Sequence, residues 1–285
     1  MVPKNRGLLP GNVGDFSGLI IVQLGLPAIL FFELYEVLPT LYADSPEYVR
    51  NLSVFVLCLF FNTELSFWMT VLKTCSLKAF SPELPSKLKP GWVYCQFCQL
   101  NAPPRSSHCF SCGACILRRD HHCVFTGNCI GFHNHRHFLT FLLNFWIGAA
   151  YAVVLNTVYL HQAGRLWSYK DVISMFLPIP AYLFGFTEHF HFFSGIMCTL
   201  SVVSLLLSTA MAYFQLLHIL YGQTAYERKH RITDFAVDWK GTLREIAGTR
   251  WYVALLSPLI PSPRHGDGLN LKKASEVRAE NIKTV

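Results

Sequence analysis

The chain has 285 residues, of which 52% are hydrophobic and only 14% are charged, and its mean hydropathy is positive. Soluble globular domains carry roughly 25% charged residues, so this composition excludes an ordinary soluble protein and indicates a membrane protein. The formal net charge is +7 at pH 7. Because the basic residues flank apolar segments and form no dense run, we expect a lipid bilayer as the partner of this charge and no nucleic acid.

Four apolar segments are long enough to cross roughly 30 Å of hydrocarbon at about 1.5 Å per residue. In chain order they cover residues 17–41, 52–72, 137–160 and 195–220. We predict a transmembrane helix in each. A fifth segment, residues 172–187, is shorter and contains Pro178 and Pro180, so we expect it to be lumenal or re-entrant.

Lys and Arg are distributed unevenly about these segments. Residues 1–16, 73–136 and 221–285 hold two, eight and eleven of the 24 basic residues, whereas the loops 42–51 and 161–194 hold the other three. Basic residues collect on the cytosolic side of a membrane protein. The N-terminus, the long central loop and the C-terminal tail are therefore predicted to be cytosolic, as an even number of spans requires.

The central loop is rich in zinc-ligand residues. Seven of the ten cysteines lie between positions 95 and 129, together with three histidines. In a reducing cytosol such cysteines bind metal instead of forming disulfides. The C-x₂-C pairs Cys95/Cys98 and Cys109/Cys112 predict two zinc ions, each with four tetrahedral ligands. Eight ligands are fewer than the ten residues present, so two residues are surplus.

The run Asp120-His121-His122-Cys123 supplies the groups of a nucleophilic site. A histidine that accepts the thiol proton lowers the pKa of a cysteine and activates it toward a thioester. Asp120 is the only acidic residue between positions 83 and 171, and it suits the role of orienting that histidine. A purely structural zinc module, such as a RING domain or a nucleic-acid-binding finger, explains the ligands but not the surplus thiol.

From Cys95 through Asn134 and Phe138, the spacing of every Cys and His resembles the cysteine-rich domain of the DHHC palmitoyltransferases, expected here over residues 93–143. The resemblance implies an α-helical polytopic membrane protein with four transmembrane helices and a cytosolic domain of short β-hairpins that binds two zinc ions. It assigns the ligands in two sets: Cys95, Cys98, His108 and Cys115 for one zinc, and Cys109, Cys112, His122 and Cys129 for the other.

The resemblance also implies a reaction. His121, oriented by Asp120, deprotonates Cys123, which takes a long fatty acyl group from an acyl-CoA such as palmitoyl-CoA and passes it to a cysteine of a membrane-associated protein. The expected ligands are two structural zinc ions and the acyl-CoA co-substrate. The expected location is an endomembrane, ER or Golgi, with the active site facing the cytosol.

An acyl chain of sixteen carbons belongs in hydrocarbon, so the resemblance places it in a cavity between the spans. Arginines on the cytosolic face are candidates for the phosphates of CoA, with contact to anionic lipid as the alternative. Gly148, ten residues beyond Phe138 and about 15 Å further along a helix, leaves room for a long chain. The expected acyl and CoA contacts are Phe125, Phe138, Phe141, Gly148, Arg105, Arg118 and Arg119.

The chain departs from the family pattern at several positions. Val-Phe at 124–125 replaces Pro-Trp, residues 73–76 replace an Asp-Pro-Gly motif, and the Thr-Thr-x-Glu motif survives only as Thr224 and Glu227. Together with Asn134, these two residues are expected to be structural. The departures support an alternative, a zinc-stabilised membrane adaptor with weak or no catalysis. A membrane-bound ubiquitin ligase is disfavoured because it leaves the surplus thiol without a role.

Overall fold

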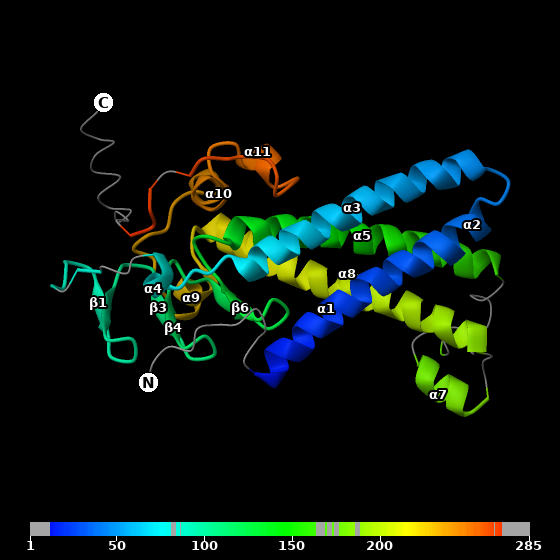
Figure 1. The fold of residues 1–285 in the computed structure, drawn as a ribbon, viewed down its shortest axis with the longest axis horizontal. Helices are drawn as coiled ribbons and strands as arrows, with labels where there is room; N and C mark the ends of the chain where they lie inside the picture. The colour runs from blue at the N-terminus through cyan, green and yellow to red at the C-terminus, as the bar shows by residue number, and fades with distance from the viewer. Residues whose placement is uncertain are drawn as a thin grey trace. The chain divides into compact units, whose positions relative to one another are not determined.

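The structure, a computed structural model, describes residues 12–80, 84, 85, 87–163, 169, 173, 177–185, 189–264 and 266–269. Helices make up most of this part of the chain (Figure 1). They are α1 (Val13–Phe32), α2 (Leu38–Leu41), α3 (Pro46–Leu72), α4 (Leu77–Phe80), α5 (His135–Gln162), α7 (Pro178–Leu183), α8 (His189–Tyr221), α9 (Ala225–Lys229), α10 (Trp239–Ala247) and α11 (Trp251–Ala254). A π-helical turn, η1 (Glu33–Val37), joins α1 to α2.

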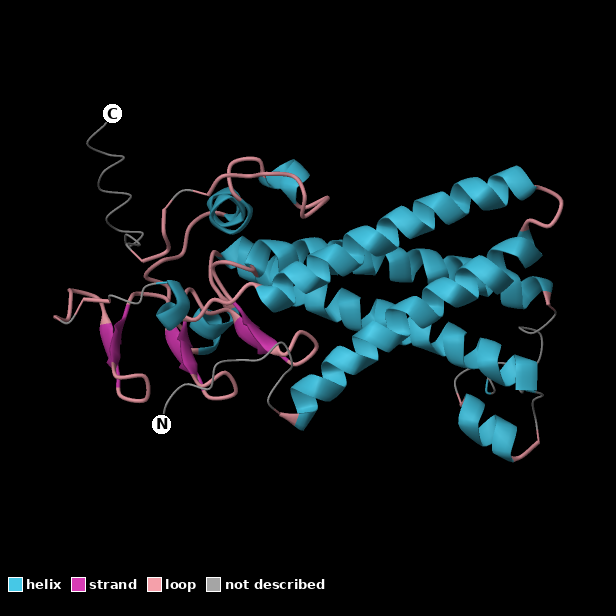
Figure 2. Ribbon diagram, in the orientation of Figure 1, coloured by secondary structure: helices cyan, strands magenta, loops and turns pink. Residues whose placement is uncertain are grey.

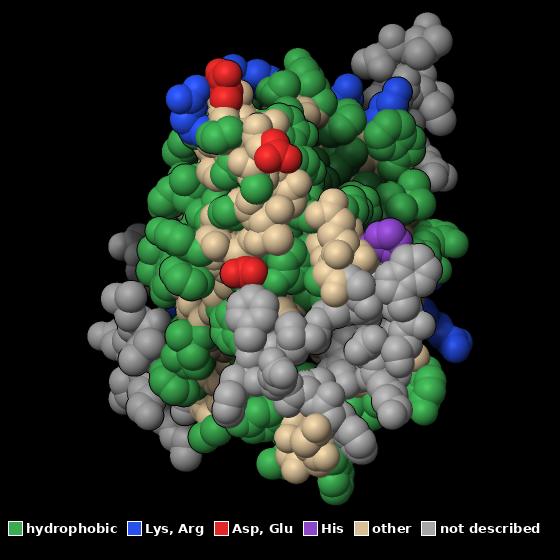
Figure 3. Space-filling view, turned by 90° about the vertical axis from the view of Figure 1, so that its right-hand side faces the viewer, with side chains coloured by type: hydrophobic (Ala, Val, Ile, Leu, Met, Phe, Trp, Pro, Cys, Tyr) green, Lys and Arg blue, Asp and Glu red, His purple; other side chains and the backbone are tan. Residues whose placement is uncertain are grey.

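Four helical stretches are long and apolar enough to cross a membrane: Val13–Leu41, Pro46–Leu72, His135–Gln162 and Phe192–Tyr221. Each contains one of the four predicted segments. Large apolar side chains on these helices, such as Leu24, Phe31 and Phe61, are exposed, and hydrophobic side chains cover much of the face in Figure 3. Apolar surface on this scale is stable in hydrocarbon but not in water. The predicted fold class, a four-span helical protein with small β-hairpins, is confirmed.

The fifth apolar segment, residues 172–187, lies partly outside the described residues. Its described part contains α7, a helix of six residues with prolines at its start. That length is far below the roughly 20 residues that a span needs. The lumenal or re-entrant placement of this segment stays a prediction.

The chain divides into two compact units. The first unit comprises Met1–Ile20, Leu65–Phe141 and Tyr213–Val285, and the second comprises Ile21–Glu64 and Leu142–Ala212. The second unit contains the C-terminal part of α1 with η1 and α2, the N-terminal part of α3, the C-terminal part of α5 and the N-terminal part of α8. Its core is formed by large side chains from α1, η1, α2, α5 and α8, including Phe32, Leu38, Leu155, Tyr159 and Met197.

The first unit contains three antiparallel hairpins of three-residue strands (Figure 2). They pair β1 (Val93–Cys95) with β2 (Leu100–Ala102), β3 (Ser107–Cys109) with β4 (Ala114–Ile116), and β5 (His121–Cys123) with β6 (Asn128–Ile130). An isolated two-stranded hairpin is at best marginally stable in water. In the register, His108 lies opposite Cys115 and His122 lies opposite Cys129, so the strands themselves bring ligand residues together.

Asn134, which is fully buried, connects the hairpins to the helix ends within the first unit. Its Nδ2 donates to the backbone oxygens of Thr70 at 3.1 Å, Lys73 at 3.2 Å and Cys129 at 3.0 Å. Its Oδ1 accepts from the backbone N–H of Gly131 at 2.9 Å. One side chain thus joins the end of α3, the end of β6 and the start of α5, which gives Asn134 a structural role.

Asn134→Ala is expected to destabilise the protein by about 3 kcal/mol or more, because each buried partner left unpaired costs roughly 1–3 kcal/mol. Thermal unfolding of the purified protein in detergent measures the change. Asn51→Ala, at an exposed position of α3, is the control and should unfold like the wild type. Equal unfolding temperatures for the two variants would contradict the role given to Asn134.

Candidate active site and metal centres

The structure brings together the two ligand sets that the family resemblance implied. In each set the candidate ligand atoms lie within 4.8 Å of one another. The sets are Cys95, Cys98, His108 and Cys115, and Cys109, Cys112, His122 and Cys129. Three thiols and one imidazole are a donor set typical of structural zinc.

The distances also fit zinc. Zn–S bonds of about 2.3 Å and Zn–N bonds of about 2.1 Å place sulfur and nitrogen about 3.6 Å apart at a tetrahedral angle. His108 Nδ1 lies 3.7 Å from Cys95 Sγ and 3.2 Å from Cys98 Sγ. His122 Nδ1 lies 3.4 Å from Cys112 Sγ. Nδ1 is therefore the metal-facing nitrogen of both histidines.

A carboxylate lies behind the histidine of the second cluster. His122 Nε2 is 3.0 Å from both carboxylate oxygens of Asp15, a buried residue near the start of α1. Asn12 Nδ2 donates to Asp15 Oδ2 at 2.7 Å, and the Asp15 N–H donates to Asn12 Oδ1 at 2.8 Å. A carboxylate in this position fixes the tautomer and orientation of a metal-binding histidine. Sequence reasoning missed Asp15 because 107 residues separate it from His122.

Strand alternation in β5 separates catalytic candidates from metal ligands. Successive side chains of a strand point to opposite faces. His122 faces the second cluster, so His121 and Cys123, its neighbours on either side, face away from it. His121 Nδ1 lies 2.8 Å from Asp120 Oδ2, and its ring meets Phe138 edge-on at 5.3 Å between centroids. Cys123 belongs to neither four-residue cluster.

The three groups adjust one another's ionisation. Burial opposes the charged form of Asp120, but the hydrogen bond with His121 and nearby positive charge hold its pKa well below the usual range. Burial also favours neutral His121, yet hydrogen bonds with Asp120 and Cys123 raise its pKa to about 10. For Cys123, burial is outweighed by the hydrogen bond and charge of His121, which lower the pKa of the thiol. The arrangement favours a thiolate beside an imidazolium.

Asp120 is held by groups from the C-terminal part of the chain. Its Oδ2 accepts from Gln215 Nε2 at 2.9 Å, and its Oδ1 accepts from the backbone N–H of Ala225 at 2.8 Å. The Oε1 of Gln215 lies 2.9 Å from His135 Nε2. These bonds fix the carboxylate that orients His121. Gln215 and His135 carried no signal in the sequence, because neither belongs to a recognisable motif.

Two of the arginines predicted to bind CoA, Arg105 and Arg118, form ion pairs with glutamates. Arg105 is buried, and its Nε and Nη1 donate to Glu227 at 2.6 Å and to Glu245 at 3.0 Å. Arg118, also buried, donates through Nη2 to Glu245 at 3.0 Å. Both guanidiniums are removed from solvent and matched by carboxylates, which argues against contact with CoA phosphates, and the CoA-binding role of Arg105 and Arg118 stays a prediction. Arg119 is half-buried and donates to the backbone oxygen of His108 at 2.7 Å.

Thr224 and Glu227 form a capping box at the start of α9. Thr224 Oγ1 accepts from the Glu227 N–H at 3.2 Å, and Glu227 Oε2 accepts from the Thr224 N–H at 2.8 Å. The turn that this box closes presents the N–H of Ala225 to Asp120. Glu227 also pairs with Arg105, so the motif links α9 to the hairpins of the first unit.

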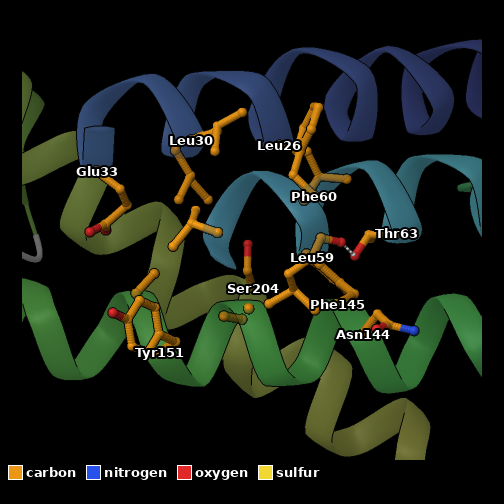
Figure 4. A pocket seen from close by; sticks show the side chains of 15 residues that line it. Leu26, Leu30, Glu33, Leu59, Phe60, Thr63, Asn144, Phe145, Tyr151 and Ser204 are labelled. Atoms are coloured by element: carbon orange, nitrogen blue, oxygen red, sulfur yellow. Dashed lines mark hydrogen bonds between the residues drawn. The ribbon is translucent and has the colours of Figure 1, made fainter. Parts of the chain in front are cut away.

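The predicted acyl contacts fall in both units. Phe138 and Phe141 are buried in the first unit, where Phe141 packs against Phe67 at 5.3 Å between ring centroids, and Phe125 is half-buried. Gly148 lines a cavity within the second unit, shown in Figure 4, whose walls include Leu26, Leu59 and Phe145. A Cβ on Gly148 would meet Leu59 Cδ2 at 3.6 Å, so the cavity borders the glycine closely.

Comparison with known proteins also points to the DHHC palmitoyltransferases. The family model described as DHHC palmitoyltransferase matches residues 89–232. Probable palmitoyltransferase ZDHHC24 of Danio rerio is 40% identical over 186 residues, which cover 65% of this chain and 63% of that protein. The Homo sapiens protein of the same name is 34% identical over 200 residues, 67% of each chain. Palmitoyltransferase ZDHHC22 of Rattus norvegicus is 34% identical over 189 residues, 63% of this chain and 64% of that one.

The chain belongs to the DHHC palmitoyltransferase family. The matched region spans about two thirds of the length of these curated relatives.

Asp15→Asn is expected to weaken zinc binding at the second cluster by about 10–100-fold, as for other carboxylates that orient a metal-binding histidine. When a chelator removes zinc from the purified full chain, the variant should release zinc from the second cluster faster than the wild type does. Release from the first cluster should be unchanged. Glu47→Gln, at an exposed acid, is the control and should release both ions as the wild type does. Release that is equally fast from both clusters, or unchanged, would contradict the role of Asp15.

Proposed function

We propose that this chain is a protein S-palmitoyltransferase that works through an acyl-enzyme on Cys123. The observation that carries the proposal is the contact of Cys123 with His121 and of His121 with Asp120, outside both four-residue clusters. Membership of the DHHC palmitoyltransferase family supports the reaction type. No feature of the described residues favours the inactive adaptor over the enzyme, because the groups of the run from Asp120 to Cys123 keep the contacts that catalysis needs.

The chemistry requires two acyl transfers. The Cys123 thiolate attacks the thioester carbonyl of acyl-CoA, the C–S bond to CoA breaks, and the departing CoA thiolate takes the proton held by His121. In the second transfer, His121 removes the proton of a substrate thiol, that sulfur attacks the Cys123 thioester, and Cys123 leaves as the thiolate beside the imidazolium. Asp120 holds the His121 ring and stabilises its charged form throughout.

Zinc, when bound, would hold the hairpins and take no part in acyl transfer. Each four-residue cluster supplies a closed set of ligands, which is typical of structural sites. Palmitoyl-CoA is the proposed co-substrate, and membrane-associated proteins with cytosolic cysteines are the proposed acceptors. The uneven distribution of Lys and Arg supports a cytosolic site, and we propose an ER or Golgi membrane as the location.

The direct test is labelling with an alkyne-tagged palmitoyl-CoA. Wild-type protein should acquire a hydroxylamine-labile label, and Cys123→Ser should acquire none while keeping about two zinc ions per chain. Cys58→Ser, at an exposed cysteine outside the clusters, is the matched control and should label fully. Equal labelling of wild type and Cys123→Ser, or none in either, would reject the proposal.

The pairing with His121 predicts how the reactivity of Cys123 depends on pH. The thiol pKa is lowered from its ordinary value of 9.0, so a larger share of Cys123 is thiolate at neutral pH than for an ordinary cysteine, and that thiolate is lost as the pH falls through the lowered value. In His121→Gln the pKa should rise, and alkylation of Cys123 by iodoacetamide at pH 7 should slow by at least about tenfold, one pKa unit. Site-resolved mass spectrometry measures the rates. An unchanged pH profile in this variant, with zinc retained, would show that His121 does not activate the thiol.

The cavity beside Gly148 predicts a dependence on acyl chain length. Gly148→Tyr should fill part of it and shift the preference of the enzyme toward shorter acyl-CoAs. Ile147→Tyr, at the adjacent and more exposed position of α5, serves as the control. Competition between acyl-CoAs of twelve to eighteen carbons gives the readout. The same preference in both variants would remove Gly148 from the acyl site.

A further inference from the structure

A second set of basic side chains lies in the first unit, apart from the buried Arg105 and Arg118. Lys73 follows the end of α3 and is exposed, Arg136 lies in the first turn of α5, and Arg264 lies in the C-terminal segment. Lys73 Nζ is 2.7 Å from Nε2 of the buried His137. The Lys73 backbone oxygen accepts from Asn134 Nδ2 at 3.2 Å, and Arg264 donates to the backbone oxygen of Phe132, so the chain around residues 132–136 brings the three cations into one region.

Backbone oxygens, not carboxylates, hold these arginines in position. Arg136 donates to the backbone oxygens of Ala254 and Ser257, each at 3.4 Å, and to that of Ile260. Arg264 donates to the backbone oxygen of Phe132, and its guanidinium lies 4.5 Å from the centre of the Phe132 ring. These bonds fix the positions of the guanidiniums and supply no negative charge to them.

Among the ion pairs of the described residues, none joins Lys73, Arg136 or Arg264 to an acid. By contrast, Arg105 and Arg118 share two glutamates. Like charges near one another at a protein surface repel. Accordingly, burial and the charges of Arg264 and Arg136 lower the pKa of Lys73, and burial together with Arg264 and Lys73 lowers the pKa of His133 to about 4. A multivalent anion would relieve this repulsion.

The cation cluster, defined as Lys73, Arg136 and Arg264, is joined to the hairpin that carries Cys123. Asn128 Nδ2 donates to the backbone oxygen of Lys73 at 3.4 Å and to that of Val71 at 3.1 Å. In the β5–β6 register, Asn128 lies directly opposite Cys123. An anion bound at Lys73 would therefore lie beside the β5–β6 hairpin and at the C-terminal end of α3.

We propose that Lys73, Arg136 and Arg264 form a binding site for phosphate groups beside the Cys123 hairpin. Two guanidiniums fixed by backbone oxygens and one exposed ammonium suit a phosphate, which accepts several charge-assisted hydrogen bonds. The phosphates can come from the CoA part of the co-substrate, which rests on the proposed function, or from the headgroup of an anionic lipid. Either source brings the same chemistry to the same cations.

The test uses the full chain in nanodiscs of phosphatidylcholine, titrated with unacylated CoA. Lys73→Gln should weaken CoA binding about tenfold, as expected for the loss of one charge-assisted hydrogen bond, and Lys73→Glu should weaken it further. Lys78→Gln, which removes an exposed lysine of α4, is the matched control and should bind as the wild type does. Thermal unfolding and zinc content verify that each variant is folded.

A second arm distinguishes the source of the phosphate. Native mass spectrometry of protein from nanodiscs that contain a phosphoinositide reports which lipids stay bound. Loss of CoA binding in the Lys73 variants identifies CoA phosphates, and loss of phosphoinositide retention alone identifies a lipid headgroup. If both Lys73 variants bind CoA and phosphoinositide like the wild type, the inference is overturned. Binding of unacylated CoA does not require a reaction at Cys123. The binding test of the cation cluster is therefore independent of the labelling test of the proposed acyl transfer.

Discussion

The arrangement of the first unit depends on the two tetrahedral ligand clusters. Three hairpins with strands of three residues bury too little surface to fold alone, and the clusters join ligands from different hairpins at fixed distances. The second cluster also decides the orientation of β5. Because His122 faces the second cluster, strand alternation turns His121 and Cys123 to the other face, where Asp120 and Phe138 meet the His121 ring.

A buried charge network completes the site from the C-terminal side. Arg105, Glu227, Glu245 and Arg118 neutralise one another, and Glu227 at the same time closes the capping box that presents the Ala225 N–H to Asp120. Removing one member would leave a buried charge unmatched, which costs several kcal/mol. The segment after α8 thus supplies contacts to the candidate active site, and the position of Asp120 is coupled to the stability of this segment.

Local signals in the sequence were sufficient for the spans and for a zinc-ligand cluster, and the family resemblance divided the ligands into the two sets that the structure brings together. Span length is set by the bilayer, and ligand spacing is set by the turns of the hairpins. Contacts between segments far apart in the chain could not be predicted from the sequence. Asp15 and Gln215 lie 107 and 95 residues from their partners, and neither belongs to a motif. For the same reason the sequence shows the positive charge of Arg105 and Arg118 but not the glutamates that pair with them.

We propose that Cys123, which belongs to neither four-residue cluster, is the nucleophile. Native mass spectrometry of the full chain, incubated with palmitoyl-CoA and followed by peptide mapping, reports zinc and acyl content on the same molecules. We expect a species with two zinc ions and one palmitoyl group, located on Cys123. Acylation found only on molecules that have lost zinc, or located on one of the eight cluster residues, would contradict it.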